Sequence, residues 1–348
     1  VNSDDVENQL RGGTNIEIAT GAGGAGGGNI TWDTGASIDY SNKAASLTLD
    51  AHGYISLKSD ITTGTGGLIL EASAGYVQSD AISISLNGPL DISTGDTTIG
   101  TTGFASPEFA ASLTGSDNLT KTGNGRLILS GNSNTWSGTT NVQGGSLRVS
   151  SANALGTSAP TRLSANTVLE IDGGVSLSEN IELNSDSSFV NVSGSNSITK
   201  PVLLKSSANI DLQAGTLTLN PTTANSVSAQ VGTTPTLTIL GSGDLVFQKI
   251  LNLGNQLDPS IATGFGVFSQ NGSGTVEFKD SLYVSTLRST GGGKVWLNQA
   301  SGVPVSSVLS ATNLIYLDNS SILRRDRTET VSGVSLQLGP NGGGIEVG

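Results

Sequence analysis

The sequence predicts an all-β fold, a right-handed parallel β-helix of roughly 17 coils. Three observations lead to this prediction: apolar residues alternate with small polar ones over short stretches, turn-forming residues bound each stretch, and the pattern returns about every 20 residues. The spacing of three and four residues that would predict helices is nearly absent. The right-handed path follows from the strong preference of parallel strands that are joined by crossovers.

The expected strands are short, and each places two or three apolar side chains on one face. Gly, Asn, Asp and Ser separate them. In chain order they are Asn15–Ile18, Asn29–Trp32, Ser46–Leu49, Gly67–Glu71, Arg126–Leu129, Ser146–Val149, Val168–Ile171, Asn209–Leu212, Thr216–Leu219, Thr236–Leu240, Thr275–Phe278, Lys294–Leu297, Asn313–Leu317 and Val334–Leu338.

The apolar positions of successive strands are evenly spaced. Leu47 lies 21 residues before Leu68, and Leu127 lies 20 residues before Leu147. Near the C-terminus, intervals of 19 to 22 residues link Val276, Val295, Leu314 and Leu336. The alternative is a sandwich or barrel with a strand every 8–12 residues or so. The scarcity of Asn-Gly and Asp-Gly pairs, which favour hairpins, supports stacked coils instead.

We expect one continuous solenoid in which the style of the repeat changes near residue 115, giving predicted domains 1–115 and 116–348. Two segments interrupt the repeat, Gly100–Asp117 and Gln256–Gly266, and we expect each to protrude as a loop or short helix. Because the end coils of a solenoid leave strand edges open, weak self-association at high concentration is also predicted.

Composition excludes several classes of protein. The chain has 348 residues, of which 48 are Gly, with no Cys or Met and a single His, so disulfide scaffolds, structural zinc sites and haem or iron–sulfur centres are excluded. The net charge of −12 argues against a nucleic-acid partner. No apolar run is long enough to span a bilayer as a helix, and no cofactor is expected. The start at Val1, without Met or a leader pattern, suggests a mature or excised segment.

One segment resembles a known repeat. Residues 118–156 resemble the autotransporter-associated β-strand repeat, also called the passenger-associated transport repeat, although Asn132-Ser133 includes one apparent extra residue. The matching residues are Leu119, Thr120, Lys121, Gly123, Gly125, Leu127, Leu129, Ser130, Gly131, Asn134, Thr135, Trp136, Gly138, Thr140, Val142, Gly145, Leu147, Val149, Ala154, Leu155 and Gly156.

A second stretch, residues 14–103, is similar to the coils of filamentous-haemagglutinin-type exoproteins, through Asn29–Trp32, Ser46–Leu49 and Gly67–Leu70. Residues 157–348 are compatible with degenerate copies of the first repeat. Together these resemblances imply a segment of a secreted bacterial surface protein, attached to the outer membrane through parts outside this chain. They also imply a right-handed parallel β-helix.

Few residues are candidates for chemistry. His52 has no second histidine to act with, so we interpret it as a turn or surface residue. The Gly21–Gly28 stretch lacks the pattern of a phosphate or calcium loop and is interpreted as a turn. Glu170, Asp172 and Glu182 could hold a cation, but solvated carboxylates in turns are the favoured reading.

Contact with a ligand is predicted at two places. The first is the interruption that carries Phe104, Glu108 and Phe109. The second is the only dense charge run, in which Arg324, Arg325 and Arg327 could meet an anionic group, although a solvated turn is the favoured reading.

The tryptophans and the turn asparagines have structural readings as well. Trp32, Trp136 and Trp296 are interpreted as core residues in preference to contacts for sugar rings. Asparagines at turns are expected to stack into ladders that fix the register of the coils; they are Asn132, Asn134, Asn196 and Asn319.

Three functions remain open. The first is a non-enzymatic adhesin or stalk, whose partners are a host or matrix glycan or protein, or other copies of itself, with contributions to biofilm formation and virulence. The second is a glycan-cleaving β-helix enzyme, which needs two carboxyl groups within about 10 Å of each other. The third is a mechanical spacer that binds nothing.

Overall fold

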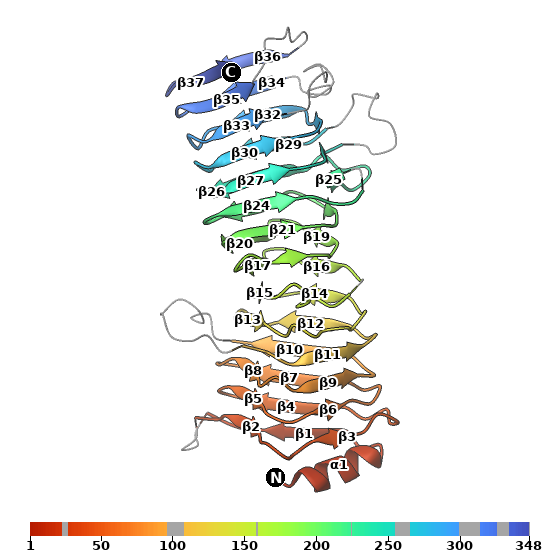
Figure 1. Cartoon of the computed structure of the whole chain (residues 1–348). Coiled ribbons are helices and arrows are strands. Elements are labelled where there is room, and N and C mark those ends of the chain that lie inside the picture. The colour runs from red at the N-terminus through yellow and green to blue at the C-terminus, as the bar shows by residue number, and fades with distance from the viewer. Residues whose placement is uncertain are drawn as a thin grey trace. The chain divides into compact units, whose positions relative to one another are not determined.

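The computed structural model describes residues 1–22, 27–95, 108–157, 159–223, 225–254, 265–298, 314–325 and 334–347. In these ranges the chain forms 37 strands and one helix, and each strand pairs in parallel with the equivalent strand of the neighbouring coil, as β1 does with β4 (Figure 1). The predicted parallel β-helix is therefore confirmed. The chain divides into two compact units, Val1–Leu169 and Glu170–Gly348; the predicted change of repeat style near residue 115 stays a prediction.

Unit 1 contains three sheets and one further strand pair, with hydrogen-bonded neighbours given in order. The largest contains β1 (Ile16–Ala19), β4 (Leu47–Ala51), β7 (Leu68–Ala72), β10 (Leu90–Thr94), β12 (Leu119–Thr122), β14 (Thr140–Val142) and β16 (Thr161–Leu163). The second contains β11 (Ser112–Gly115), β9 (Ser83–Leu86), β6 (Ile61–Thr62) and β3 (Ile38–Asp39). The third contains β2 (Ile30–Trp32), β5 (Ile55–Leu57) and β8 (Val77–Ser79). The pair is β13 (Arg126–Leu129) with β15 (Ser146–Val149).

The strand β17 (Val168–Asp172) lies at the boundary between the units. The strands of unit 2 after it form three sheets. One contains β19 (Ile181–Leu183), β22 (Val202–Leu204), β25 (Asn225–Ala229), β28 (Ile250–Asn252) and β31 (Leu282–Tyr283). The next contains β20 (Ser188–Ser193), β23 (Ala208–Leu212), β26 (Thr236–Gly241), β29 (Val267–Gln270), β32 (Thr286–Ser289), β34 (Leu314–Leu317) and β36 (Ser335–Leu338). The last contains β18 (Ser176–Leu177), β21 (Ser195–Ile198), β24 (Thr216–Leu219), β27 (Asp244–Phe247), β30 (Thr275–Phe278), β33 (Lys294–Leu297), β35 (Ser321–Arg325) and β37 (Gly343–Val347).

The predicted strands are all present, within a residue or two at their ends. Their inward positions stack in register, as Leu47 pairs with Leu68 and Leu127 with Leu147. These residues are buried because alternation in a strand sends every second side chain to the interior. Local alternation therefore predicts both the strands and the core.

The predicted spacing fails near the C-terminus. Val276 does pair with Val295, but the next partner of Val295 is Leu323, and Leu314 lies in a different sheet, opposite Thr286. The coil that follows β33 includes residues 299–313, which lie outside the described residues. The longer coil shifts the repeat, so a fixed interval selects the wrong leucine.

The helix α1 (Ser3–Arg11) was not predicted, although its signals are present in the sequence. The Asn2 side chain caps it by accepting a hydrogen bond from the backbone N–H of Asp4, at 3.0 Å. Val6 and Leu10, four residues apart, are buried where the helix contacts β1 and β3 (Figure 1). A single short helix is easily overlooked in a chain dominated by strand patterns.

Candidate ligand-binding groove

The structure separates the residues predicted to contact ligand. Phe104 and Arg327 lie outside the described residues. Glu108 is exposed, but Phe109 is only 1% exposed and forms parallel bridges with Ser79 and Leu129. Phe109 is thus part of the core of unit 1 and does not protrude, because its backbone continues the stacking of the neighbouring coils.

The second predicted contact involved neighbouring arginines, and the structure places Arg324 and Arg325 on opposite faces of β35. Arg325 points inward, is 8% exposed and donates from Nη1 to the carbonyl oxygen of Leu297 at 3.0 Å. Arg324, the preceding residue, is half-buried on the outer face. Strand alternation therefore assigns one arginine to the core and the other to the surface.

Arg324 belongs to a column of outward-facing side chains in unit 2. Successive strands of this sheet place one residue in register at each step. The column runs through Ser176, Ser197, Thr218, Val246, Glu277, Trp296, Arg324 and Glu346. The side chains of this column are small at its beginning and large from Glu277 onward. The outer surface of the sheet is therefore low over the small side chains and higher over the large ones.

A shallow groove of about 340 Å³ lies where the small side chains of the column are followed by the large ones. Two columns line it. Val246, Glu277, Trp296 and Arg324 belong to the first, and Thr216, Asp244, Thr275 and Lys294 to the neighbouring one, with Leu245 between them. The groove therefore combines one aromatic ring, two carboxylates, two cations and two hydroxyl groups.

Trp296 corrects the prediction that all three tryptophans are core residues. Trp32 and Trp136 are 6% and 0% exposed, as predicted, whereas Trp296 is half-buried on the outer face. The guanidinium carbon of Arg324 lies 4.8 Å from the centroid of the Trp296 ring, a cation–π contact between two residues in register on neighbouring strands. The structure thus brings together two residues that the sequence analysis treated separately.

The charged groups of the groove are held by neighbouring residues. Lys294 Nζ lies 3.0 Å from Glu346 Oε2, and Asp244 Oδ1 accepts a hydrogen bond of 2.7 Å from the backbone N–H of Thr275. Glu277 accepts a hydrogen bond from Asn298 Nδ2. These contacts restrict the conformations of the charged side chains that line the groove.

A similar contact occurs elsewhere in unit 2, away from this groove. The guanidinium carbon of Arg288 lies 5.3 Å from the centroid of the Tyr316 ring, with the two residues in register on β32 and β34. Neither residue lines the groove. This pair provides a matched control for the pair formed by Trp296 and Arg324.

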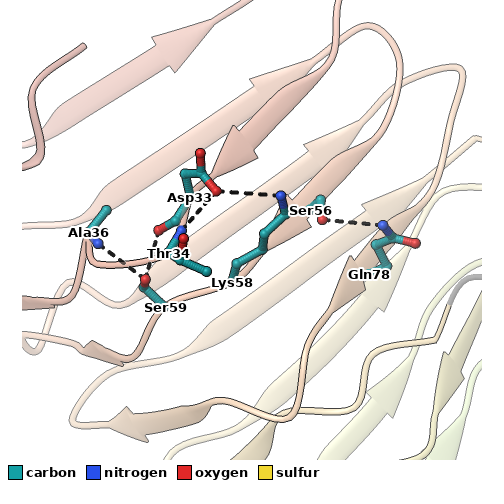
Figure 2. Close-up of polar contacts among 7 residues, drawn as sticks. All are labelled: Asp33, Thr34, Ala36, Ser56, Lys58, Ser59 and Gln78. Atoms are coloured by element: carbon teal, nitrogen blue, oxygen red, sulfur yellow. Dashed lines mark hydrogen bonds and ion pairs between the residues drawn. The ribbon is translucent and has the colours of Figure 1, made fainter.

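The outer face of unit 1 carries small polar contacts of another kind, shown in Figure 2. Lys58 Nζ donates to Asp33 Oδ1 at 3.4 Å, Ser59 Oγ donates to the Asp33 carbonyl oxygen at 2.7 Å, and Gln78 Nε2 donates to Ser56 Oγ at 3.2 Å. Each bond joins residues about one coil apart in sequence. These side chains connect coils to one another.

Within the repeat itself, two polar side chains that carry hydrogen bonds between coils are buried, those of Lys121 and Asn134. Lys121 is 0% exposed, and its ammonium donates to the carbonyl oxygens of Thr122, Gly123 and Gly144. Burial lowers the pKa of Lys121 to about 8. Sequence reasoning did not find this role, because a lysine among strand residues is normally assigned to the surface.

Asn134 has an equally structural role in the repeat. It is 3% exposed, accepts from the backbone N–H of Leu113 at 2.7 Å, and donates to the carbonyl oxygens of Gly131 and Ala154. These bonds join three coils through backbone groups. Asn134 therefore does help to fix the register, but by bonding to backbone and not to another asparagine of a ladder.

Of the remaining candidates, Glu170 is only 5% exposed within β17, so its interpretation as a solvated turn carboxylate is wrong, and the others lie closer to the surface. Glu182 forms an ion pair with Lys205 at 3.7 Å, and Asp172 accepts a hydrogen bond of 2.6 Å from Ser193 Oγ. His52 is half-buried, and its backbone N–H donates to Thr20 Oγ1. A Cβ on Gly28 would lie 2.8 Å from the Gly21 carbonyl oxygen, so this turn requires glycine.

Neither a metal site nor a membrane span is found in the described part of the chain. No group of three or more His, Asp and Glu side chains there is arranged to hold a metal ion. The helix described above is too short and too polar to cross a membrane, and no other helix occurs in the same ranges.

Comparison with known proteins gives one match. Residues 119–149 match the family model described as Passenger-associated-transport-repeat. No curated protein and no solved structure matches the chain significantly. The match confirms the repeat that the sequence placed over residues 118–156.

Proposed function

We propose that this chain, an autotransporter passenger-like protein that is secreted or exposed at the cell surface, is a non-enzymatic adhesive segment attached to the bacterial outer membrane. It contacts a host or matrix ligand, or other copies of itself, through the outer faces of its coils. The groove bounded by Trp296 and Arg324 is the observation that carries this proposal. A pre-arranged mixture of aromatic, charged and hydroxyl groups is typical of a binding surface.

A glycan-cleaving enzyme is the second candidate, because Asp244 and Glu277 line the same groove. Glycosidases use one protonated and one ionised carboxyl group, placed on either side of the bond that breaks. Here Asp244 accepts from a backbone N–H, and Glu277 lies 3.9 Å from Lys279 Nζ and accepts from Asn298. These contacts engage both carboxyl groups with residues of the chain itself. We therefore favour binding over cleavage.

The test is an array of glycans and matrix proteins, probed with the purified chain, together with light scattering over a range of concentrations. We expect a saturable signal on at least one class of ligand, or a mass that rises with concentration. Reducing ends are assayed on every glycan that binds, and no product is expected. Release of product would support the enzyme instead. A blank array together with a strict monomer would overturn the proposal and favour a spacer.

A further inference from the structure

We propose that the groove in unit 2 binds an uncharged saccharide, and this inference rests on the proposed adhesive function. The argument uses the ring of Trp296, the balance of charge around it, and the position of the groove on the face of a sheet. Together these three features favour one class of ligand and argue against others.

The Trp296 ring supplies a flat apolar surface in the groove. Arg324 packs at 4.8 Å from its centroid, and the ring lines the groove beside Val246 and Glu277. The negative face of an aromatic ring attracts partially positive hydrogen atoms. The C–H face of a sugar ring presents such atoms, and its flat shape matches an indole.

The groove also surrounds the ring with hydrogen-bonding groups. Asp244 and Glu277 are acceptors, and each carboxylate has more lone pairs than its bonds to Thr275 and Asn298 use. The Lys294 ammonium has three N–H groups, and Thr216 adds a hydroxyl group that both donates and accepts. Sugar hydroxyl groups also both donate and accept, so they can satisfy either kind of partner.

The charge balance argues against a charged ligand. Two carboxylates, Asp244 and Glu277, face two cations, Lys294 and Arg324, so the lining has no net charge. The whole chain carries a charge of −12 and would repel a polyanion at long range. Both cations already contact other groups, Glu346 and the Trp296 ring, and this reduces their attraction for an anion.

The place of the groove argues against a peptide strand. The lining residues lie on the face of β24, β27, β30, β33 and β35, and the backbone of each of these strands bonds to a strand on either side. No strand edge is available there for an added strand, so recognition must use side chains. An amphipathic helix would need a broad apolar surface, and the exposed apolar part of the lining is limited to Val246 and Trp296.

The experiment uses the full chain and three sets of probes: uncharged oligosaccharides of three or four hexose units, oligosaccharides of equal length that contain uronic acids, and inorganic phosphate. Binding is followed by saturation-transfer NMR and by the change in tryptophan emission. We expect saturable binding of at least one uncharged oligosaccharide and none of phosphate.

Two variants identify the site. Trp296→Leu should weaken binding of that oligosaccharide by about tenfold or more, because removing a central aromatic contact has effects of this size. Tyr316→Leu, which removes the ring of the other arginine–aromatic pair, should leave binding unchanged. Thermal unfolding of both variants, monitored by circular dichroism, shows whether the fold is retained; if Trp296→Leu unfolds, Thr216→Val and Asp244→Asn replace it as probes of the groove.

Each other outcome overturns the inference. Preferential binding of the uronic acid set or of phosphate would assign the groove to anions. Equal binding by wild type and Trp296→Leu would place the saccharide elsewhere on the chain. If no uncharged oligosaccharide binds while the chain still adheres to a matrix protein or to itself, the saccharide inference fails and the adhesive function stands. If nothing binds and the chain is a strict monomer, both fail.

Discussion

The repeat in unit 1 and the groove in unit 2 both contain polar and charged side chains, but these point into the interior in the repeat and toward the surface in the groove. In the repeat, Lys121 and Asn134 point inward, and backbone groups of adjacent coils satisfy them. In the groove, Glu277, Lys294 and Trp296 point outward and line a depression. In this fold the direction of a side chain decides what it contacts: inward polar groups bond to backbone groups of adjacent coils, whereas outward groups bond to other side chains of neighbouring coils or line the groove.

The largest expected effect on the free energy of unfolding concerns an inward-facing residue, Trp136. Trp136 is 0% exposed, and its indole N–H donates to the carbonyl oxygen of Gly138 at 3.1 Å. Replacing Trp136 with Ala creates a cavity and removes this bond, so the free energy of unfolding should fall by about 3–5 kcal/mol. Denaturant unfolding followed by circular dichroism measures the change. A loss below about 1 kcal/mol would contradict a core role for Trp136.

The second prediction concerns pH and the buried Glu179. This side chain is 3% exposed, and burial raises its pKa from 4.5 to about 7, although the charge of Lys200 opposes the rise. The folded state therefore favours the protonated carboxyl group. Its contribution to stability is complete below pH 4.5, declines between pH 4.5 and 7, and is lost above that range, a change of about 3 kcal/mol.

The variant Glu179→Gln isolates this effect, since an amide does not titrate. The difference in unfolding free energy between wild type and Glu179→Gln should shift by about 3 kcal/mol from pH 4 to pH 8, in favour of the variant at high pH. Glu182→Gln is the control, because Glu182 forms a partly exposed ion pair with Lys205. An equal shift in both variants would show that burial of Glu179 is not the cause.

A smaller effect is expected at Asn134. Replacing it with Ala leaves the backbone N–H of Leu113 and the carbonyl oxygens of Gly131 and Ala154 without this partner. We expect the free energy of unfolding to fall by about 2 kcal/mol, because buried polar groups are left unsatisfied. Asn132→Ala, a change at an exposed neighbour in the same repeat, should cost much less. Similar losses in the two variants would remove the distinction between inward and outward asparagines.

Much of the fold is predictable from local sequence. A strand such as Ser146–Val149 is recognised by its alternating residues and by the glycines before it, and stacking of equal coils then gives the core. The helix Ser3–Arg11 could also have been predicted from Asn2 and from the spacing of Val6 and Leu10. Its signal is local and was outweighed by the strand patterns that follow.

The groove could not be predicted in the same way. Trp296 and Arg324 meet because two strands pair with a fixed register, and the long coil between them hides that register from the sequence. Alternation alone does separate Arg324 from Arg325, once the limits of the strand are known. The burial of Lys121 depends on carbonyl oxygens of an adjacent coil, which no local pattern contains.

The most direct test of this division is the unfolding free energy of Trp296→Ala, measured in the same denaturant as that of Trp136→Ala. Trp296 lies on the outer face, where its contact with Arg324 contributes little to the stability of the fold. We predict that Trp296→Ala remains within about 1 kcal/mol of the wild type. A loss as large as that of Trp136→Ala would show that the outward ring holds the coils together, and would contradict the assignment of this face to binding.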